Sequence, residues 1–410
     1  MKIAFLLESF PNISETWLIN QILDLKRRGF QVSIYSLYRS KSELIHEDVV
    51  RSGLLDKTWY FFIPKESNKL KVLRELLVFI FKNSGNFTFR KLNFGIKALA
   101  SRKIEKLFFL NYLFQKELDE SEIVHAHYGD QGIIACKMSK AGFLKKSKIV
   151  ISFHGHDIFP YRLEYFKINY KIFNEFSNHL IVNSKYSFSL LKAIDDFKNV
   201  SILPVGLNTS KFKPVATFDS KVVRLVFVGR LIYLKGADFA LDIMNKLRAE
   251  VEGIKLVIIG DGELKETIIQ KIKNLKLENY VELLGSLTQQ EVIAQLTRSD
   301  IFLYPARNDP FFKGSETQGL VIQEAQSMGL PVVCSDVGGI KYGLKDGITG
   351  FLVNEYDLDG FVEKLKFLVK NPLIRREMGD LGRKYIVENF DSKVLGEKLI
   401  GIYKNVLNDN

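Results

Sequence analysis

Short apolar runs, separated by polar turns, recur through the first half of the chain. Most are rich in β-branched residues and nearly unbroken, which is typical of strands buried on both faces of a parallel sheet. A segment that starts at Ser14 and ends before Gly29 has helical spacing instead, because Leu18, Ile22 and Leu25 would share one face. The predicted strands are Ile3–Leu7, Val32–Leu37, Ile123–Tyr128, Ile149–Phe153, Leu180–Asn183 and Ile202–Val205.

A second series follows the polar stretch Lys213–Thr217, which we interpret as a linker. Helical segments such as Ala237–Leu247 and Gln290–Leu296 again alternate with apolar runs, and the tail Ile374–Leu407 looks helical. Two successive strand–helix series predict an α/β protein with two doubly wound, Rossmann-like domains that face each other across a cleft. The predicted strands of this series are Leu225–Val228, Leu256–Ile259, Val281–Leu284, Ile301–Tyr304, Val332–Ser335 and Phe351–Val353.

The stretch Asp309–Gly339 contains a predicted loop, a helix that opens at about Gln318–Gly319 and stops at Gly329, and a buried strand, Pro331–Asp336. One carboxylate, Glu316, lies in the predicted loop just before this helix, and another, Glu324, lies within the helix. These two residues and the backbone amides between them make this stretch the first candidate for a binding or catalytic site.

Glu324 falls on or beside the apolar stripe of this helix, where a carboxylate is costly unless it is hydrogen-bonded. Glu316 lies in the loop at the helix mouth. Between them, the free amides of Gln318, Gly319 and Leu320 would accept an anion. This arrangement suits a sugar nucleotide, which brings a diol, a diphosphate and a hexose. The alternative is that Glu316 only caps the helix and that Glu324 pairs with a buried Lys or Arg.

Two cations follow the first predicted strand of the second series. The sequence F-V-G-R-L-I-Y-L-K-G places Arg230 and Lys235 just past the end of this strand, and open α/β sheets bind ligands at those carboxyl ends. A forked guanidinium and a compact ammonium suit a diphosphate. They could equally be two ordinary surface cations in a strand-to-helix loop.

The turn G-D-G-E-L also follows a strand, and its glycines, Gly260 and Gly262, could let the backbone approach a phosphate. It lacks the third glycine of a dinucleotide-binding fingerprint, and no acidic residue ends the next strand at the expected position. The sequence therefore argues against an NAD-dependent dehydrogenase.

In the first domain, I-S-F-H-G-H-D places His154 at the carboxyl end of a buried strand, where Gly155 lets the chain turn. A lone histidine is more often structural than catalytic, but at this edge it would face the second domain and line the cleft. His156 and Asp157 are candidates for binding an acceptor or for fixing the loop.

Two further motifs of the first domain end or follow strands. H-A-H-Y-G-D, from His125 to Asp130, places His127 where it could line the same cleft. F-P-N-I-S-E-T-W, from Phe10 to Trp17, starts the first helix. Its residues could hold the hydroxyls or phosphate of an acceptor, or form only a well-capped helix start. The acceptor candidates in this motif are Ser14, Glu15 and Thr16.

The four histidines of these motifs lie on two strands and lack the spacing of metal ligands, so we expect neither a metal ion nor another cofactor. They are His125, His127, His154 and His156.

The formal net charge of +12 is unevenly distributed, because twelve Lys or Arg and four Glu fall between Pro64 and Glu117, interleaved with phenylalanines. Anionic membrane surfaces attract such segments. Nucleic acid is the other polyanion to consider, but no recognisable binding motif accompanies the charge. We therefore expect peripheral contact with an anionic membrane and no nucleic acid. The alternative is a solvated face over a core of Phe and Leu.

The chain has only two cysteines, Cys136 and Cys334, which favours free thiols in a reducing compartment. Its start, MKIAFLLESF, looks like a first strand and not a signal peptide, because Glu8 interrupts the apolar run. No apolar run approaches the length of a membrane span. We expect a cytoplasmic protein, peripheral on the inner face of the cell membrane.

The segment E-T-Q-G-L-V-I-Q-E-A-Q-S-M-G-L-P-V-V-C-S-D-V-G-G resembles the signature of glycosyltransferase family four, a large group of retaining enzymes with the GT-B fold. The resemblance covers nearly the whole second domain. The Phe10–Trp17 motif resembles the branch that builds bacterial exopolysaccharide, as in colanic acid synthesis, and O-antigen repeats. The family resemblance implies an acceptor-binding domain over residues 1–213 and a nucleotide-sugar-binding domain over 214–387. It also implies a last helix, 388–410, that crosses back to the first domain.

By this resemblance, Glu316 would contact the donor hexose and Glu324 the ribose hydroxyls. Gly229-Arg230 and Lys235 would hold the donor diphosphate, together with the glycine-containing turn at Gly260 and Gly262. His154 would lie near the reacting sugar. The catalytic candidates are therefore His154, Glu316, Arg230 and Lys235.

The sequence departs from the family pattern at two places. Lys341-Tyr342 stand where the family usually has Pro-Glu, and Thr317 stands where it has Gly. Both lie near the expected donor, so the selectivity of relatives for sugar and base does not carry over.

These observations predict a retaining hexosyltransferase that moves a hexose from a nucleotide-diphospho-sugar to a lipid-linked saccharide in bacterial surface polysaccharide synthesis. Two alternatives are a nucleotide-sugar epimerase of the same fold and a non-catalytic partner subunit that binds nucleotide or glycan.

Overall fold

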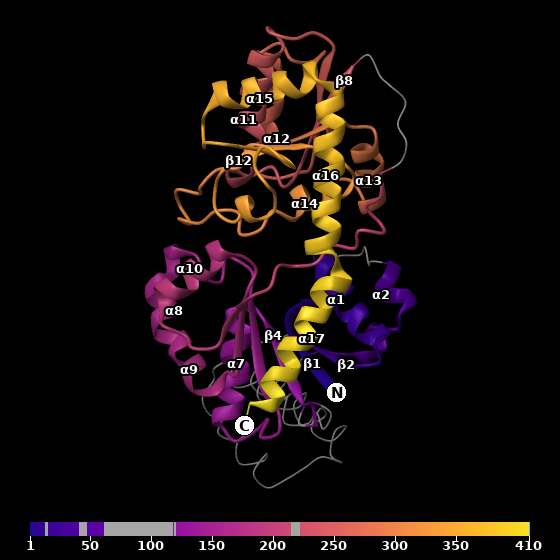
Figure 1. Cartoon of the computed structure of the whole chain (residues 1–410). Helices are drawn as coiled ribbons and strands as arrows, with labels where there is room; N and C mark the ends of the chain where they lie inside the picture. Colours follow the sequence, from indigo (N-terminus) through magenta and orange to yellow (C-terminus); the bar gives the residue numbers. More distant parts are fainter. Residues whose placement is uncertain (13–14, 41–46, 61–117, 119, 215–221, 410) are drawn as a thin grey trace, which may run out of the picture.

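The computed structural model describes residues 1–12, 15–40, 47–60, 118, 120–214 and 222–409. Within these residues the chain forms two domains, each a parallel sheet with helices on its faces (Figure 1). The predicted fold class, α/β with two doubly wound domains of the GT-B type, is confirmed. Ser14 and the whole of the basic aromatic segment Pro64–Glu117 lie outside the described residues.

The first domain is built on a seven-stranded sheet in the described chain, in the order β3-β2-β1-β4-β5-β6-β7. Its strands are β1 (Lys2–Phe10), β2 (Gln31–Arg39), β3 (Thr58–Tyr60), β4 (Ile123–His127), β5 (Lys148–Phe153), β6 (His179–Val182) and β7 (Val200–Ile202). Its helices are α1 (Thr16–Arg27), α2 (Glu47–Arg51), α7 (Gly129–Lys140), α8 (Leu163–Asn169), α9 (Phe173–Phe176) and α10 (Lys185–Ile194).

The unbroken apolar runs are explained by a separate core on each face of this sheet. Along β1, Ala4 and Leu6 belong to the core on the side of α7, whereas Ile3, Phe5 and Leu7 belong to the core that α1 and the C-terminal helix cover. Because successive side chains of a strand point to opposite faces, both sets must be apolar. The same strands therefore hold the residues at their carboxyl ends in fixed positions.

The second domain contains a six-stranded sheet among the described residues, in the order β10-β9-β8-β11-β12-β13. Its strands are β8 (Val223–Val228), β9 (Ile254–Ile259), β10 (Val281–Gly285), β11 (Ile301–Tyr304), β12 (Val332–Ser335) and β13 (Gly350–Val353). Its helices are α11 (Ala237–Leu247), α12 (Lys265–Asn274), α13 (Gln289–Thr297), α14 (Leu320–Ser327), α15 (Leu358–Lys370) and α16 (Pro372–Phe390).

The C-terminal tail is helical and breaks at Asp391, between α16 and the last helix, α17 (Ser392–Asn408). Figure 1 shows α16 along the second domain and α17 continuing onto the first. There, Leu399 and Tyr403 of α17 enter the core beneath β1. The break also pairs with the linker, because the amide of Leu207 donates to the Phe390 carbonyl at 2.9 Å.

Three details of the first domain differ from the sequence predictions. The strand predicted at Ile202–Val205 lies earlier, as β7 at Val200–Ile202, and the linker between the domains begins at Leu203 instead of the predicted Lys213. The short edge strand β3 was not predicted. Helix α1 begins at Thr16 with Glu15, and not Ser14, in the N-cap position. None of the helices that the structure describes combines the length and the apolar character that crossing a membrane requires.

Candidate active site

The second-domain wall of the cleft is formed by the loop after β8 and by the start of α14. Arg230 follows β8 directly, and Lys235 ends a 3₁₀ turn, Tyr233–Lys235, just before α11. Gly319 stands in the N-cap position of α14 with a positive φ of 77°, and its helix has no side-chain cap. The amide groups of a helix's first turn have no partners within the helix. No side chain therefore caps the start of α14, which leaves its first amides available to a ligand.

Lys235 and Glu316 form an ion pair across these two loops. The phenol of Tyr304, at the end of β11, donates a second hydrogen bond to the same carboxylate oxygen, Oε2, at 3.0 Å. The other oxygen, Oε1, has no hydrogen-bond partner among the described residues. Oε2 of Glu316 is thus held by two side chains, whereas Oε1 is left for a ligand. The carboxylate of Glu316 also partly neutralises the charge of Lys235.

Glu316 is ionised despite its burial. Burial acts to raise the pKa of its carboxyl group, but the charge of Lys235, the hydrogen bonds from Lys235 and Tyr304, and the nearby charge of Arg230 outweigh it, so the pKa is lowered. Arg230 is exposed, and its guanidinium has no hydrogen-bond or ion-pair partner in the described part of the chain. An exposed, unpaired guanidinium beside an open helix start can bind a diphosphate.

Glu324 lies on α14 and is partly buried. It has no hydrogen-bond or ion-pair partner for its carboxylate among the described residues, so the internal ion pair that the sequence left open as an alternative does not form. Burial raises its pKa to about 7. Hydrogen bonds donated by a ligand would stabilise the ionised form of this carboxyl group, which burial disfavours.

Gly260 and Gly262 have positive φ angles and serve the packing between two loops. A Cβ at Gly260 would lie 1.8 Å from the carbonyl oxygen of Gly229, and one at Gly262 would lie 2.6 Å from that of Leu231. No larger residue fits at either position. Their glycine identity therefore follows from the close approach of the loops, whether or not a phosphate also binds there.

The first-domain wall of the cleft is a cluster of histidines at the ends of β4 and β5. The rings of His125 and His127 have centroids 4.3 Å apart, and Nδ1 of His127 lies 3.0 Å from Nε2 of His154. His125 contacts the Ser152 hydroxyl at 2.7 Å and the phenol of Tyr403 on α17 at 2.6 Å. Helix α17, which packs on the first domain, thus contributes a hydrogen-bonding side chain to the histidine cluster.

All three imidazoles are neutral. Burial lowers the pKa of His125 and of His154 to about 3, and a neighbouring imidazole adds to the effect at each, His154 at His125 and His156 at His154. Burial likewise lowers the pKa of His127 well below its ordinary value. A protonated ring in this cluster would lack both water and a counter-ion.

The loop after β5 is held by Asp157. Its carboxylate accepts hydrogen bonds from the backbone amides of His154 and Gly155, at 3.1 and 2.8 Å, and from Gly129 at 3.1 Å. Asp157 therefore fixes the loop, the second of the two roles that the sequence left open for it. His156, by contrast, is exposed beside Tyr128, with ring centroids 5.1 Å apart.

At the start of α1, Glu15 accepts a hydrogen bond from the Tyr128 phenol at 2.7 Å. Burial raises the pKa of Glu15, and the hydrogen bond partly offsets this. Thr16 is partly buried beside it. The indole of Trp17, one residue further, lies 4.5 Å from the His154 ring between centroids. The predicted acceptor motif and the histidine cluster are thus brought together.

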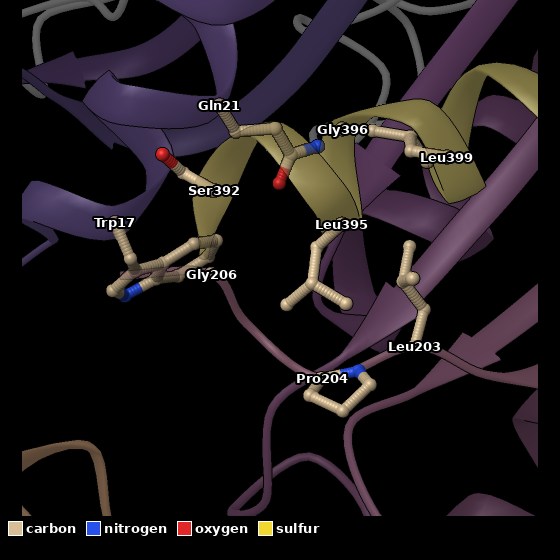
Figure 2. Close-up of a pocket in the computed structure, with 9 residues that line it drawn as sticks. All are labelled: Trp17, Gln21, Leu203, Pro204, Gly206, Ser392, Leu395, Gly396 and Leu399. Atoms are coloured by element: carbon tan, nitrogen blue, oxygen red, sulfur yellow. The ribbon is translucent and has the colours of Figure 1, made fainter. Parts of the chain in front are cut away.

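Trp17 also lines a small pocket between α1, α17 and residues 203–206 (Figure 2). Together with Gln21 it faces Leu395 and Leu399 of α17 across a cavity of about 30 Å³. The linker closes the cavity with Leu203, Pro204 and Gly206. Such a space holds about one water molecule and no sugar, so this contact is packing that holds the linker against both helices.

The two walls meet at Thr317. Its hydroxyl donates to the backbone carbonyl of His154 at 3.1 Å and accepts from the side-chain amide of Asn183 at 3.1 Å. Beside it, a cavity of about 400 Å³ between the domains is lined in part by Lys341 and Tyr342, the pair by which the sequence departs from the family pattern. This volume lies in the range of ligand pockets.

The sequence of the second domain matches a known family. The family described as "Glycosyl transferases group 1" matches residues 208–385. These residues form a glycosyltransferase group 1 domain.

Relatives of this glycosyltransferase are similar over most of its length. It is 26% identical to the amylovoran biosynthesis glycosyltransferase AmsK of Erwinia amylovora over 363 residues, which is 87% of this chain and 88% of AmsK. It is 24% identical to the putative colanic acid biosynthesis glycosyltransferase WcaL of Escherichia coli K12 over 420 residues, 98% of this chain and 99% of WcaL.

Solved structures share the fold of the glycosyltransferase. Anabaena Alr3699/HepE, in complex with UDP, superposes with a TM-score of 0.70 at 16% identity. The superposition covers 99% of this chain and 100% of the Alr3699/HepE chain. A glycosyltransferase from Rickettsia africae superposes with a TM-score of 0.71 at 18% identity, with 100% of this chain and 99% of its own covered.

The glycosyltransferase site contains residues that the sequence did not single out. Tyr304 ends β11, Asn183 follows β6 and Trp17 lies in the first turn of α1. Tyr304 and Asn183 stand at the carboxyl ends of parallel strands, where ligands of such sheets bind, so this rule, applied to every strand, would have found them. In the described chain no group of three or more His, Cys, Asp or Glu is arranged to hold a metal ion.

Proposed function

We propose that this glycosyltransferase moves a hexose from a nucleotide-diphospho-sugar to a saccharide acceptor with retention of configuration at the anomeric carbon. The observation that carries the proposal is the cluster at the start of α14. There, Lys235, the exposed Arg230 and an uncapped helix start surround a carboxylate, Glu316, that keeps one oxygen open. Cations and helix amides suit a diphosphate, and an open carboxylate oxygen suits sugar hydroxyls.

The difficult part of such a reaction is the departure of a diphosphate from an oxocarbenium-like centre. Arg230, Lys235 and the first amides of α14 would stabilise the negative charge that develops on the leaving oxygen. Because Lys235 is already paired with Glu316, its ammonium is held in place before the donor binds. The proposal assigns this charge to side chains and to the helix, without a metal ion.

Glu316 and Glu324 would position the two ends of the donor. The open Oε1 of Glu316 would accept hydrogen bonds from the hexose, and the unpaired carboxylate of Glu324 would accept them from the ribose hydroxyls. The raised pKa of Glu324 supports the second role, because ribose hydrogen bonds would favour the ionised carboxylate that burial alone disfavours. Such positioning lowers the barrier without taking part in bond making.

His154 would line the other side of the sugar as a neutral ring. In the transfer step, the acceptor oxygen forms a bond to the anomeric carbon while the bond to the diphosphate oxygen breaks. We propose that attack occurs on the face that the diphosphate leaves, and that the departing diphosphate takes the proton of the acceptor hydroxyl. This accounts for retention without a carboxylate nucleophile.

We further propose that the acceptor is a lipid-linked saccharide at the cytoplasmic membrane face and that the product is a bacterial exopolysaccharide. The names of AmsK and WcaL support the polysaccharide class. The basic, aromatic segment Pro64–Glu117 supports contact with an anionic surface. The acceptor would be held by the first domain, with Glu15, Thr16 and His156 near its hydroxyls, whereas His127 is buried against His154 and lies out of the acceptor's reach.

A binding screen followed by a transfer assay tests the proposal. Thermal shifts over UDP, GDP, ADP and dTDP would identify the base, since a ligand that binds only the native protein raises its apparent stability. The selected nucleotide-sugar is then incubated with the membrane fraction of a polysaccharide-producing bacterium. We expect labelled sugar in lipid-extractable product. An isomerised donor formed without acceptor would indicate an epimerase, and binding without turnover a non-catalytic subunit.

Liposome flotation tests the membrane contact separately. We expect the protein to float with vesicles that contain phosphatidylglycerol and not with neutral phosphatidylcholine vesicles. A variant with the Lys and Arg of the Pro64–Glu117 segment replaced by Gln should lose this preference. Equal flotation with both vesicle types would count against the proposed surface.

A further inference from the structure

Thr317 stands where the family pattern has Gly, and its side chain makes contacts that Gly could not make. Its hydroxyl uses both of its hydrogen-bonding modes across the cleft, as donor to the His154 carbonyl and as acceptor from the Asn183 amide, each at 3.1 Å. Thr317 and Asn183 are almost fully buried, at 7% and 6% exposure. We call these two hydrogen bonds the Thr317 bridge.

The first-domain side of the bridge is held in place by its own contacts. The side-chain oxygen of Asn183, Oδ1, accepts a hydrogen bond from the Ser187 hydroxyl at 2.6 Å, and this contact orients the side-chain NH₂ group of Asn183 toward Thr317. The loop of His154 is fixed by Asp157. The methyl group of Thr317 packs against Gly155, where an added Cβ would lie 3.0 Å from it. The bridge therefore joins two ordered loops.

The neighbouring residue, Gln318, makes a different kind of contact. Its side-chain oxygen accepts from the amide of Val205 at 2.7 Å, and its side-chain nitrogen donates to the carbonyl of Val205 at 2.8 Å. Val205 belongs to the linker between the domains. Contacts at a linker move little when domains rotate, whereas contacts across the cleft form and break. Gln318 thus anchors the linker, while the Thr317 bridge depends on closure.

The bridge lies between the two residues that would flank the transferred sugar. Thr317 follows Glu316 directly in sequence, and the carbonyl it binds belongs to His154. Any change in the bridge must therefore change the separation between Glu316 and the imidazole. A displacement of about 1 Å at a reacting centre can cost as much as 100-fold in rate.

We propose that Thr317 is a positioning residue of this chain: its hydroxyl joins the two domains in the closed arrangement and fixes the distance between Glu316 and His154. The roles of those two residues rest on the proposed function, but the contact between the domains does not. In this proposal the bridge forms as the domains close around the donor, so it acts on the step after donor binding.

Replacing the hydroxyl by a methyl group tests this. In Thr317→Val the packing against Gly155 is kept and both hydrogen bonds are lost, whereas Thr317→Ser keeps both. With the best of UDP-glucose, GDP-mannose, ADP-glucose and dTDP-glucose as donor, we expect Thr317→Val to lower kcat about tenfold and to leave the donor KM within about twofold. Thr317→Ser should stay close to wild type.

A matched control separates the bridge from the general effect of losing a threonine hydroxyl. Thr297→Val removes a hydrogen bond to the Ile293 carbonyl inside α13, away from the cleft, and should leave kcat unchanged. Asn183→Ala removes half of the bridge and should lower kcat less than Thr317→Val. The double variant should be no worse than Thr317→Val alone, because both changes break the same hydroxyl's contacts.

Small-angle X-ray scattering gives a second readout that needs no turnover. Thr317→Val should increase the radius of gyration relative to wild type and Thr317→Ser, because the domains open. A kcat for Thr317→Val within twofold of wild type, or a Thr317→Ser variant as slow as Thr317→Val, would overturn the proposal. If the wild type transfers no sugar, the proposed function fails. In that case a radius of gyration that is the same for Thr317→Val and the wild type overturns the proposed bridge.

Discussion

The second-domain wall of the cleft carries an ion pair at its centre, whereas the first-domain wall carries a cluster of neutral imidazoles. Glu316 keeps its charge because the ammonium of Lys235 lies against it at an open helix start. The first-domain imidazoles are also buried, but among the described residues their hydrogen-bond partners are one another, a serine and a tyrosine. Burial therefore lowers the pKa of His125 and His154 to about 3, so they carry no charge at neutral pH.

This difference matches the charges of the reaction that we propose. A diphosphate gains negative charge as it leaves, so cations and helix amides stabilise it. The sugar gains positive charge at the same time, and a protonated imidazole beside it would oppose that change. Neutral rings on the sugar side and cations on the diphosphate side are therefore both favourable. The comparison predicts that the two walls respond differently to substitution and to pH.

The largest expected effect is on activity at the charged wall. Glu316→Gln keeps the shape of the side chain and removes its charge, which both frees Lys235 and weakens the hydrogen bonds to the sugar. We expect kcat to fall at least about 100-fold, as when a preorganised contact of the transition state is removed. The measurement is steady-state transfer at saturating donor.

The neutral wall provides the comparison for this variant. His154→Gln should lower kcat by only about tenfold, because a neutral ring contributes position and not charge. Glu252→Gln, at an exposed position of the second domain, should have no effect and controls for the substitution itself. If His154→Gln were as severe as Glu316→Gln, the division of charge between the walls would be wrong as an account of catalysis.

The next effect concerns acid stability of the first domain. The unfolded chain protonates its histidines near pH 6.5, but the native His125 and His127 take up protons only well below that. Their contribution to native stability is therefore present above about pH 6.5 and is lost as pH falls toward their folded pKa values. Between pH 6.5 and 5.5 each should cost about 1 kcal/mol of unfolding free energy.

Urea unfolding at the two pH values measures this loss. Both tryptophans of the chain, Trp17 and Trp59, belong to the first domain, so tryptophan fluorescence reports that domain alone. His127→Asn should reduce the pH dependence by about 1 kcal/mol, whatever it does to stability at pH 6.5. An unchanged dependence in this variant would mean that His127 is not buried as a neutral ring.

The sequence predicted the charged wall better than the neutral one, and the reason is physical. Glu316, the open start of α14 and Glu324 belong to one continuous stretch, so helical spacing and burial rules apply to them directly. The structure adds that Glu316 pairs with Lys235 across two loops. Spacing places both residues at one edge of the sheet, but it says nothing about which side chains meet there.

The neutral wall depends on contacts between distant parts of the chain. The phenol that contacts His125 comes from Tyr403, on the last helix. The indole beside His154 comes from Trp17. No local pattern links these residues, because the crossing of α17 and the order of strands decide which of them meet. The strands themselves, whose apolar runs are local, were largely predicted.

A pH effect of opposite sign is expected at the charged wall. The pKa of Glu324 is raised by burial to about 7, above its value in the unfolded chain. Its contribution to stability is therefore fully present at low pH and is lost as pH rises through 7. From pH 6 to pH 8 the expected loss is about 1.3 kcal/mol. Glu324→Gln should remove this loss and be the more stable protein at pH 8.

Nucleotide binding checks the same residue independently. If ribose hydroxyls donate to Glu324, binding favours its ionised form, and the affinity for the selected nucleoside diphosphate should increase from pH 6 to pH 8. Isothermal titration of wild type and Glu324→Gln should show this increase in the wild type only. Parallel pH profiles would argue that Glu324 lies outside the ribose site.

The smallest expected effect compares two buried tyrosines, one behind each wall. Tyr304 donates to the charged Glu316, and Tyr403 contacts the neutral His125. Tyr403→Phe leaves a buried nitrogen of His125 without its partner, which should cost about 1 kcal/mol of first-domain stability, measured by the same urea unfolding. Because His125 does not face the sugar, kcat should stay within about twofold. Tyr304→Phe should do the reverse, lowering kcat while tryptophan fluorescence shows an unchanged first-domain transition. If both tyrosine variants affected activity alike, the two walls would have to act as one coupled unit.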